Sequence, residues 1–184
     1  MNYRNIDDLI KEIQPAKIIG IDGFNGSGKT YLSREIGKIL NIPVLNLDDY
    51  LIKDTHSYVE YLKYEEISEF IEKNKNSFII EGVCLLDVLK KLHLNLDCLI
   101  YVKLIDEYDE WLHEDECDIR DSAEETIKRL EDTIKILYPN NQGLDAFRKE
   151  IIYYHANNRP FEKANYVFER IEVKDGCEPI TQQI

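Results

Sequence analysis

The chain contains 184 residues, of which 43% are hydrophobic, and it carries a net charge of −13 with a pI near 4.8. This length favours one domain spanning residues 1–184, with enough apolar residues to fill a core. An acidic surface repels nucleic acid polymers and anionic membranes, so we expect neither as a partner. The charge does not exclude an anionic small substrate, because a local site can be positive in a negative protein.

Targeting and cysteine patterns favour a cytoplasmic protein. The N-terminal stretch MNYRNIDDLIKEIQ is amphipathic and acidic, and it lacks the apolar core of a signal peptide. No apolar run approaches the roughly 20 residues that span a bilayer. The four cysteines form no C-x-x-C pair and have no histidine at metal-ligand spacing, which favours reduced thiols. The sequence does not indicate an oligomeric state.

Helix and strand patterns alternate along the chain. A short amphipathic helix around residues 6–13 precedes the first strand, KIIGID at 17–22, which leads into a glycine-rich loop. Further strands are predicted at 43–47, 77–81, 97–104 and from 164 onward. Further helices are predicted at 28–40, 58–73, 84–93 and 106–118, and apolar stripes predict two more around 127–137 and 144–154.

This alternation predicts a three-layer α/β domain. Parallel neighbours need a crossover connection, and near-continuous apolar strands are buried on both faces. We therefore expect a parallel sheet of about five strands with helices on both faces. The predicted helix at 106–118 has eight Asp or Glu residues and no Lys or Arg, which we interpret as a solvated helix face.

The loop after the first strand matches the phosphate-binding motif G-x-x-x-x-G-K-[ST] at every fixed position, and a helix follows it as the motif requires. Its backbone N–H groups and the positive end of the helix dipole suit a phosphate. Lys29 would reach the β- and γ-phosphates, and the Thr30 hydroxyl would ligate Mg²⁺. The predicted phosphate-binding residues are Gly23, Asn25, Gly26, Ser27, Gly28, Lys29 and Thr30.

The rest of the chain disfavours two classes of P-loop protein. A GTPase should carry a guanine-reading N-K-x-D after a later strand, and the run at 73–76, KNKN, has no Asp at the required place and precedes its strand. A motor ATPase usually ends a strand in Asp-Glu and needs more chain. A small-molecule kinase remains, with ATP or GTP as the donor left open.

Acidic residues follow two further strands. Asp48 and Asp49 follow the strand at 43–47, and Glu81 ends the strand at 77–81. Ligands of parallel sheets lie at the carboxyl ends of the strands, beside the phosphate loop. A kinase needs one carboxylate to take the proton of an acceptor hydroxyl and others to hold Mg²⁺. A turn or helix cap is the alternative explanation for the aspartate pair.

Four segments together resemble the uridine kinase-like branch of the P-loop kinases, which includes phosphoribulokinase and pantothenate kinase. These segments run in the family's order, cover most of the chain from 17 to 168, and read IDGFNGSGKTYLSREI, LNLDDYL, FIIEGVCLL and YYHANNRPFEKANYVFE. The resemblance implies the P-loop NTPase fold with a small helical lid. It also implies ATP and Mg²⁺ as cofactors and transfer to a hydroxyl, which in nucleoside kinases is the ribose 5′-hydroxyl.

The resemblance also implies residue roles. Asp48 matches the family's catalytic base, which also neighbours the metal, while Thr30 and Glu81 match its Mg²⁺-side groups. Lys29 and a lid arginine would complete the catalytic set. The candidate lid is 106–130, where Arg120 precedes Asp121 as in the family's Arg-Asp pair. Arg129 is the alternative lid arginine, and for both the other explanation is a surface cation paired with nearby acids.

The acceptor cannot be named from these residues. Where the family ends in Ala-Asp, this chain has Asn165, and the segment before Arg120 is unusually acidic for a lid. Candidate substrate residues are Asp49, Tyr50, His56 and Arg159. The predicted function is therefore ATP-dependent phosphorylation of a small-molecule hydroxyl, with a nucleoside favoured. The alternatives are a pantothenate or sugar kinase of the same fold and a nucleotide-binding regulatory protein without transferase activity.

Overall fold

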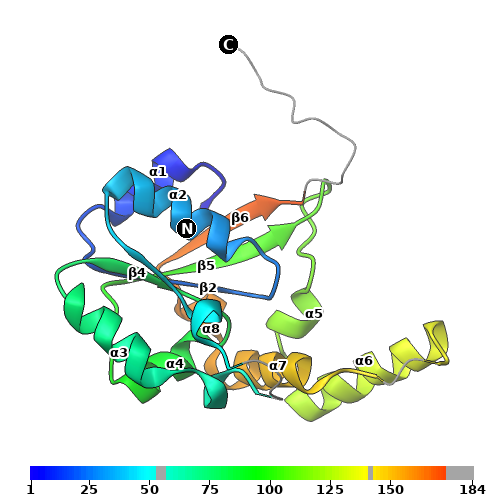
Figure 1. Cartoon of the computed structure of the whole chain (residues 1–184). Coiled ribbons are helices and arrows are strands. Elements are labelled where there is room, and N and C mark those ends of the chain that lie inside the picture. The colour runs from blue at the N-terminus through cyan, green and yellow to red at the C-terminus, as the bar shows by residue number, and fades with distance from the viewer. Residues whose placement is uncertain (53–56, 141–142, 173–184) are drawn as a thin grey trace.

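The computed structural model describes residues 1–52, 57–140 and 143–172. One parallel six-stranded sheet forms its centre, in the order β1-β6-β5-β2-β4-β3 (Figure 1). The strands are β1 (Asn2–Tyr3), β2 (Ile18–Gly23), β3 (Val44–Asn46), β4 (Phe78–Glu81), β5 (Cys98–Ile105) and β6 (Tyr166–Ile171). The expected count of five was wrong by the edge strand β1, since two residues are too short to give a strand pattern.

Helices cover both faces of the sheet, as expected. They are α1 (Ile6–Ile13), α2 (Lys29–Leu40), α3 (Tyr64–Lys73), α4 (Leu85–Leu92), α5 (Glu114–Cys117), α6 (Ala123–Leu137), α7 (Ala146–Asn158) and α8 (Pro160–Lys163), with 3₁₀ turns η1 (Leu47–Tyr50) and η2 (Val59–Tyr61). The predicted helix at 58–73 is therefore divided into η2 and α3. No helix within the described ranges combines the length and apolar character that crossing a membrane requires.

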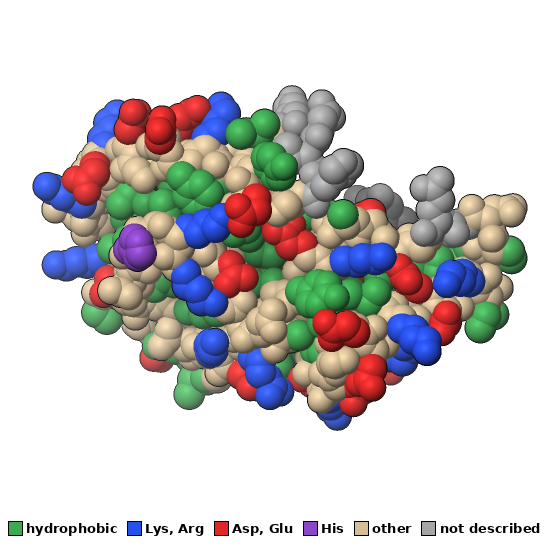
Figure 2. Space-filling view, turned by 90° about the horizontal axis from the view of Figure 1, so that it is seen from below, with side chains coloured by type: hydrophobic (Ala, Val, Ile, Leu, Met, Phe, Trp, Pro, Cys, Tyr) green, Lys and Arg blue, Asp and Glu red, His purple; other side chains and the backbone are tan. Residues whose placement is uncertain are grey.

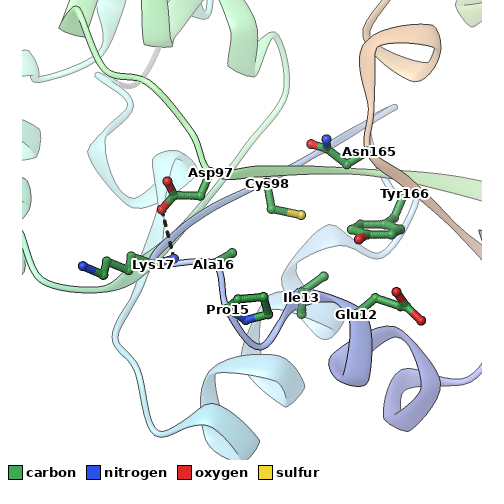
Figure 3. A pocket seen from close by; sticks show the side chains of 9 residues that line it. All are labelled: Glu12, Ile13, Pro15, Ala16, Lys17, Asp97, Cys98, Asn165 and Tyr166. Atoms are coloured by element: carbon green, nitrogen blue, oxygen red, sulfur yellow. Dashed lines mark hydrogen bonds between the residues drawn. The ribbon is translucent and has the colours of Figure 1, made fainter.

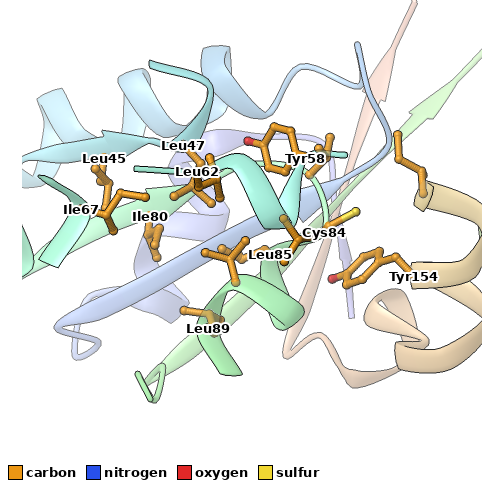
Figure 4. Packing of buried hydrophobic residues seen from close by; sticks show 14 of the residues in the cluster. Leu45, Leu47, Tyr58, Leu62, Ile67, Ile80, Cys84, Leu85, Leu89 and Tyr154 are labelled. Carbon is orange, nitrogen blue, oxygen red and sulfur yellow. The ribbon is translucent and has the colours of Figure 1, made fainter. Parts of the chain in front are cut away.

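Two apolar clusters bind the layers together. On one face, α1 and α2 pack on the sheet through residues such as Leu9, Leu32 and Ile21. On the other face, α3, α4 and α7 pack through a cluster that includes Ile67, Leu85 and Tyr154 (Figure 4). Successive residues of a strand point to opposite faces, so each central strand contributes to both clusters.

The segment 106–118 differs from the predicted helix. Its first part is a turn in which the Asp106 carboxylate accepts hydrogen bonds from the backbone of Tyr108 at 2.8 Å and Glu110 at 2.9 Å. The chain then returns antiparallel to the end of β5, with a bridge between Ile105 and Trp111. Helix is confined to the four residues of α5. Aspartate readily accepts from the backbone two residues on, which stabilises a turn against a helix.

Helix α6 extends away from the sheet (Figure 1). Its first turns are buried, because Ala123 and Ile127 pack with Leu144 and with Ile152 of α7. The predicted apolar stripe does not continue as a buried face to the end of the helix. Leu137, the last residue of that stripe, is 64% exposed.

Candidate active site

The phosphate loop lies between β2 and α2, as the motif predicts. Gly26 and Gly28 have φ of 77° and 98°, a left-handed conformation that side chains rarely adopt. The loop leads directly into the N-terminus of α2, a helix of 12 residues. The Ser27 hydroxyl inside it is fully buried and has no hydrogen-bond partner among the described residues. A buried polar group without a partner fits a site shaped for a polar ligand.

Lys29 is held inside this loop. Its side chain is buried, and Nζ donates a hydrogen bond to the Phe24 carbonyl oxygen at 2.8 Å. Burial lowers the pKa of Lys29, and the negative charges of Asp22, Glu81 and Asp48 oppose this shift. The lysine therefore sits where three carboxylates act on one cation. Their charges favour the protonated form of Lys29, and a protonated amine inside the loop can bind the negative charge of a phosphate chain.

Asp22 was not among the predicted site residues. It ends the apolar part of β2, is completely buried, and accepts hydrogen bonds from the Gly23 N–H at 2.7 Å and from the Tyr154 hydroxyl. Burial raises its pKa to about 6, although both hydrogen bonds and Lys29 act in the opposite direction. The signal in the sequence was an aspartate in an otherwise apolar strand. Its partner in α7 could not be found without the fold.

Glu81 lies at the carboxyl end of β4, beside the loop. Strand pairing aligns it with Ile21 of β2 and Asn46 of β3. The side chain is 1% exposed, and in the part of the chain that the structure describes its Oε1 has no hydrogen-bond partner. Burial raises the pKa of Glu81, while a hydrogen bond with Thr30 and the charge of Lys29 lower it. An unpaired carboxylate oxygen next to Thr30 is a good ligand for a hard cation.

Asp48 lies in η1, directly after β3, and its side chain is exposed. The Asn46 side chain caps this turn by accepting from the Asp48 N–H at 2.9 Å. The Tyr58 hydroxyl donates to Asp48 Oδ1 at 2.6 Å, and the buried hydroxyl has a raised pKa, through burial first and then the charge of Asp48. Tyr58 thus fixes one oxygen of Asp48 and leaves the other for a ligand.

Two further residues shape the surroundings of Asp48. A Cβ on Gly82 would lie 2.8 Å from Leu47 Cδ1 and 2.9 Å from the Tyr58 hydroxyl, so this glycine makes room for neighbouring protein atoms. Glu150 of α7 also supports the site. Its carboxylate accepts from the N–H groups of Tyr58 at 2.6 Å and Val59 at 3.1 Å.

The candidate substrate residues have varied surroundings. Asp49 is exposed, and Tyr50 is half-buried with its carbonyl accepting from the Lys63 N–H at 3.0 Å. His56 lies outside the described residues. Arg159 follows the last turn of α7 with φ of 47° and forms an ion pair with Glu162 at 2.6 Å.

The two candidate lid arginines are paired with acids. Arg120 lies 3.1 Å from Asp118, and Arg129 of α6 lies 3.3 Å from Asp115. Both line a hollow of about 290 Å³ together with Glu114, Asp118, Asp121 and Thr126. Within the described ranges, no hydrogen bond or ion pair joins either arginine to the phosphate loop, Asp48 or Glu81.

The prediction of a solvated helix face at 106–118 is wrong for Glu116. It is buried, and Arg148 of α7 donates two hydrogen bonds to it at 2.5 and 2.6 Å. Although burial raises the pKa of Glu116, hydrogen bonds from Arg148 and His113 lower it to about 2. The His113 ring also stacks on Phe24 of the phosphate loop, with 4.2 Å between centroids. The α5 segment is therefore attached both to α7 and to the loop.

The residues brought together suit Mg²⁺ bound with phosphate. No group of three or more His, Cys, Asp or Glu side chains that could hold a metal ion by themselves occurs in the part of the chain that the structure describes. Mg²⁺ commonly takes one or two carboxylates, and phosphate and water oxygens complete its shell. Thr30, Asp48 and the unpartnered oxygen of Glu81 fit that pattern.

Two of the larger hollows lie at the amino ends of the strands. One of about 390 Å³ is lined by residues such as Pro15, Asp97 and Tyr166, and the Asp97 carboxylate there accepts from the Lys17 N–H at 3.0 Å (Figure 3). Another of about 730 Å³ is lined by residues that include Lys90 and His93. Neither contains a phosphate-loop residue. On the face drawn in Figure 2, acidic and basic side chains are interspersed, so no single large charged field marks a site.

Comparisons with known proteins agree with this fold. No protein-family model matches the chain. A cytidylate kinase of Pyrobaculum aerophilum is 30% identical over 97 residues, covering 47% of this chain and 53% of that protein. A cytidylate kinase of Pyrobaculum islandicum is 32% identical over 81 residues, covering 42% and 44%. The chain thus spans about half the length of the curated relatives it matches.

A solved structure shares the fold over nearly the whole chain. It is described as a possible uridine kinase from Bacillus stearothermophilus and matches with a TM-score of 0.52 at 17% identity, covering 89% of this chain and 96% of that one. The three-layer P-loop fold that the motifs predict is therefore confirmed, and the chain resembles P-loop kinases in both sequence and structure.

Proposed function

We propose that the protein is a kinase that uses ATP and Mg²⁺ to phosphorylate a hydroxyl of a small molecule, with a nucleoside as the favoured acceptor. One observation carries the proposal. Strand pairing sets the buried, unpartnered Glu81 oxygen beside the phosphate loop and beside the end of β3, after which Asp48 follows. Such a grouping joins a phosphate cradle, a metal ligand and a general base at one edge of the sheet.

The donor side of the mechanism rests on the loop. Its N–H groups and Lys29 would hold the phosphate chain, and the low exposure of Lys29 strengthens its attraction to that charge. Thr30 and Glu81 would ligate Mg²⁺, with Asp48 beside the metal, and the ion would neutralise charge that develops on the phosphates. The hydrogen bond of Lys29 to Phe24 keeps the ammonium in the loop before the nucleotide binds.

The acceptor side rests on Asp48. Tyr58 holds Oδ1, so Oδ2 is free to accept the hydrogen bond of an acceptor hydroxyl and take its proton as the phosphoryl group transfers. Orientation of this kind places the acceptor in line with the γ-phosphate.

The charges around Asp48 favour a neutral acceptor. Asp48 and Asp49 are exposed, and neither forms an ion pair within the described ranges. A nucleoside or a sugar avoids repulsion by these carboxylates, whereas the carboxylate of a pantothenate-like alcohol does not. The relatives named cytidylate kinase give a reason to include cytidine and its monophosphate among the acceptors tested.

The segment 106–130 is the proposed lid of the single domain. Arg120 or Arg129 would exchange its acidic partner for the transferring phosphate as the segment closes. Closure would also exclude water, which otherwise competes for the phosphoryl group. The net charge of −13 supports the absence of nucleic acid polymers and membranes among the partners, and we propose a cytoplasmic location.

A nucleotide-binding regulatory protein without transfer is the second candidate. The exposed, acid-paired lid arginines favour it, because they are not aimed at the loop. It predicts stabilisation of the fold by nucleotide and no phosphorylated product from any acceptor.

A screen with labelled donor separates these functions. Wild-type protein and Lys29→Ala would be incubated with Mg²⁺, ATP or GTP, and nucleosides, cytidine monophosphate, sugars or pantothenate-like alcohols. We expect a nucleoside product from the wild type, and a loss of both nucleotide affinity and turnover in Lys29→Ala. Nucleotide binding with no product from any acceptor would favour the regulatory function.

A further inference from the structure

Arg170 lies against the phosphate loop from a distant part of the chain. It is near the end of β6, and its side chain crosses to Gly28, the last glycine of the loop. A Cβ placed on Gly28 would lie 2.6 Å from Arg170 Cδ and 2.9 Å from its Cζ. The space that the missing Gly28 side chain leaves is thus filled by an arginine.

Among the described residues, Arg170 forms no ion pair with an acidic side chain, which is unusual in this protein. The chain has seven arginines and 36 acidic residues. Five of the arginines form ion pairs with Asp or Glu, namely Arg4, Arg120, Arg129, Arg148 and Arg159. Within the described ranges, Arg34 and Arg170 do not. Arg170 is a half-buried residue, and an arginine without a counter-charge among the described residues of so acidic a chain is suited to an anion that comes from outside the protein.

Independent features at the same place point to the chemistry of that anion. The buried Ser27 hydroxyl has no partner, and Ser27 directly precedes Gly28. The N-terminus of α2 begins one residue later, where N–H groups lack helical partners. In loops of this type the backbone N–H groups surround the α- and β-phosphates. The anion that meets Arg170 at Gly28 is therefore the inner part of a nucleoside triphosphate.

We propose that Arg170 binds the α- and β-phosphates of the donor nucleotide. The proposal rests on the proposed kinase function and assigns a residue of the same site that the motifs did not reveal. A planar guanidinium can bind two phosphate oxygens at once, which a lysine cannot do in the same geometry. Arg170 would hold the nucleotide from the β6 side, and Lys29 would hold its outer phosphates from within the loop.

Tyr31 is the positioning residue for this arginine. It is the third residue after Gly28, its side chain is 56% exposed, and the Arg170 Cζ lies 5.9 Å from the centre of its ring. An arginine over an aromatic face keeps its edge free for hydrogen bonds. The ring thus orients the guanidinium while leaving its N–H groups available to phosphate.

Calorimetric titration of the protein with Mg·ATP and with Mg·ADP tests the assignment. Replacement of Arg170 by Gln should lower the affinity for both nucleotides by roughly 10- to 100-fold, as expected for the loss of a charge-assisted contact. Arg170→Lys should recover part of the loss, because it keeps the charge without the fork. Arg4→Gln is the control, because it removes an exposed arginine that pairs with Glu169, the neighbour of Arg170 in β6. This variant should bind both nucleotides as the wild type does.

Each outcome decides between defined alternatives. Equal affinities of wild type and Arg170→Gln would overturn the Arg170 assignment and leave the kinase function standing. A loss for ATP without a loss for ADP would overturn the α/β-phosphate assignment. If the wild type bound neither nucleotide, the proposed function and this inference would both be wrong. Thermal unfolding without nucleotide shows whether Arg170→Gln folds. If it does not fold, the affinity of Arg170→Lys decides, and a value equal to that of the wild type would overturn the assignment.

Discussion

Helices α6 and α7 each direct one arginine to the short helix α5, and the two ion pairs differ in their surroundings. Arg129 of α6 and Asp115 are 52% and 68% exposed. Arg148 of α7 pairs with Glu116, whose side chain is 4% exposed. A pair with a buried carboxylate fixes its segment, because Glu116 would be left unsatisfied without Arg148, whereas a pair in which both groups are exposed contributes little. Arg148 of α7 thus anchors α5, whereas Arg129 of α6 stays available to a ligand.

The contrast extends along both helices. Helix α7 contacts η2 through Glu150, Asp22 of β2 through Tyr154, and β5 through His155, whose Nε2 lies 2.9 Å from the Tyr101 hydroxyl. Within the described ranges, no hydrogen bond or ion pair joins residues 134–137 of α6 to these elements, and Ile136 there is 79% exposed. We conclude that α7 is the fixed support of the site and that α6 belongs to the part whose contacts can be exchanged.

The largest expected effect concerns two buried groups that contact α7 or lie in it, Asp22 and His155. Their contributions to the free energy of unfolding change with pH in opposite directions. The pKa of Asp22 is raised from 3.8 to about 6. Its contribution to the free energy of unfolding is therefore complete below pH 3.8 and is lost as the pH rises through 6, a loss of about 3 kcal/mol. Burial lowers the pKa of His155 from 6.5 to about 4. Its contribution to the free energy of unfolding is therefore complete above pH 6.5 and is lost as the pH falls through 4, a loss of about 3 kcal/mol.

Variants at these two positions should diverge between pH 4 and 7. Relative to wild type, the free energy of unfolding of Asp22→Asn should rise with pH, and that of His155→Gln should fall. Chemical denaturation at a series of pH values measures both. Curves parallel to wild type for both variants would contradict the burial of these groups against α7.

The ion pairs of the two helices give the next largest effect. Arg148→Ala leaves the buried Glu116 carboxylate without its partner, so the free energy of unfolding should fall by roughly 2–3 kcal/mol at pH 7. Arg129→Ala should change it by less than about 0.5 kcal/mol, because its pair is exposed. Urea titration of both variants measures the difference, and equal losses would remove the distinction between the helices.

The contact between Tyr58 and Asp48 should have a smaller effect on stability and a visible effect on turnover. Tyr58→Phe removes one hydrogen bond, at a cost of about 1 kcal/mol. It also frees the Asp48 oxygen that Tyr58 holds, so we expect kcat to fall by roughly 3- to 10-fold with KM for ATP unchanged. Tyr153→Phe, at a 40% exposed tyrosine of α7, is the matched control. An unchanged kcat in Tyr58→Phe would show that Tyr58 does not position the base.

The smallest expected effect on stability is that of Arg120→Ala. Arg120 is 77% exposed and pairs with Asp118, so we expect a change of less than about 0.5 kcal/mol in the free energy of unfolding. If the lid proposal is right, the same variant lowers kcat for transfer. A stable variant with wild-type turnover would transfer that role to Arg129 or exclude it.

The sequence predicted where the loop and Glu81 lie in the fold better than it predicted the contacts that support them. The loop and Glu81 follow from a local motif and from a strand end, so periodicity and spacing were enough. Tyr154 and Arg170 lie 132 and 142 residues from their partners Asp22 and Gly28 in the chain, and only the fold reveals such pairs. The helix predicted at 106–118 failed because Asp106 accepts from two backbone N–H groups and stabilises a turn.

The central claim is that Asp48 takes the proton of an acceptor hydroxyl at a phosphate-transfer site. A single-turnover reaction of wild type and Asp48→Asn with labelled ATP, Mg²⁺ and the best nucleoside from the screen tests it most directly. We predict similar affinity for ATP and a rate of transfer lower by roughly 100-fold or more in Asp48→Asn. Equal transfer rates in the two proteins would contradict the assignment of Asp48 as the base.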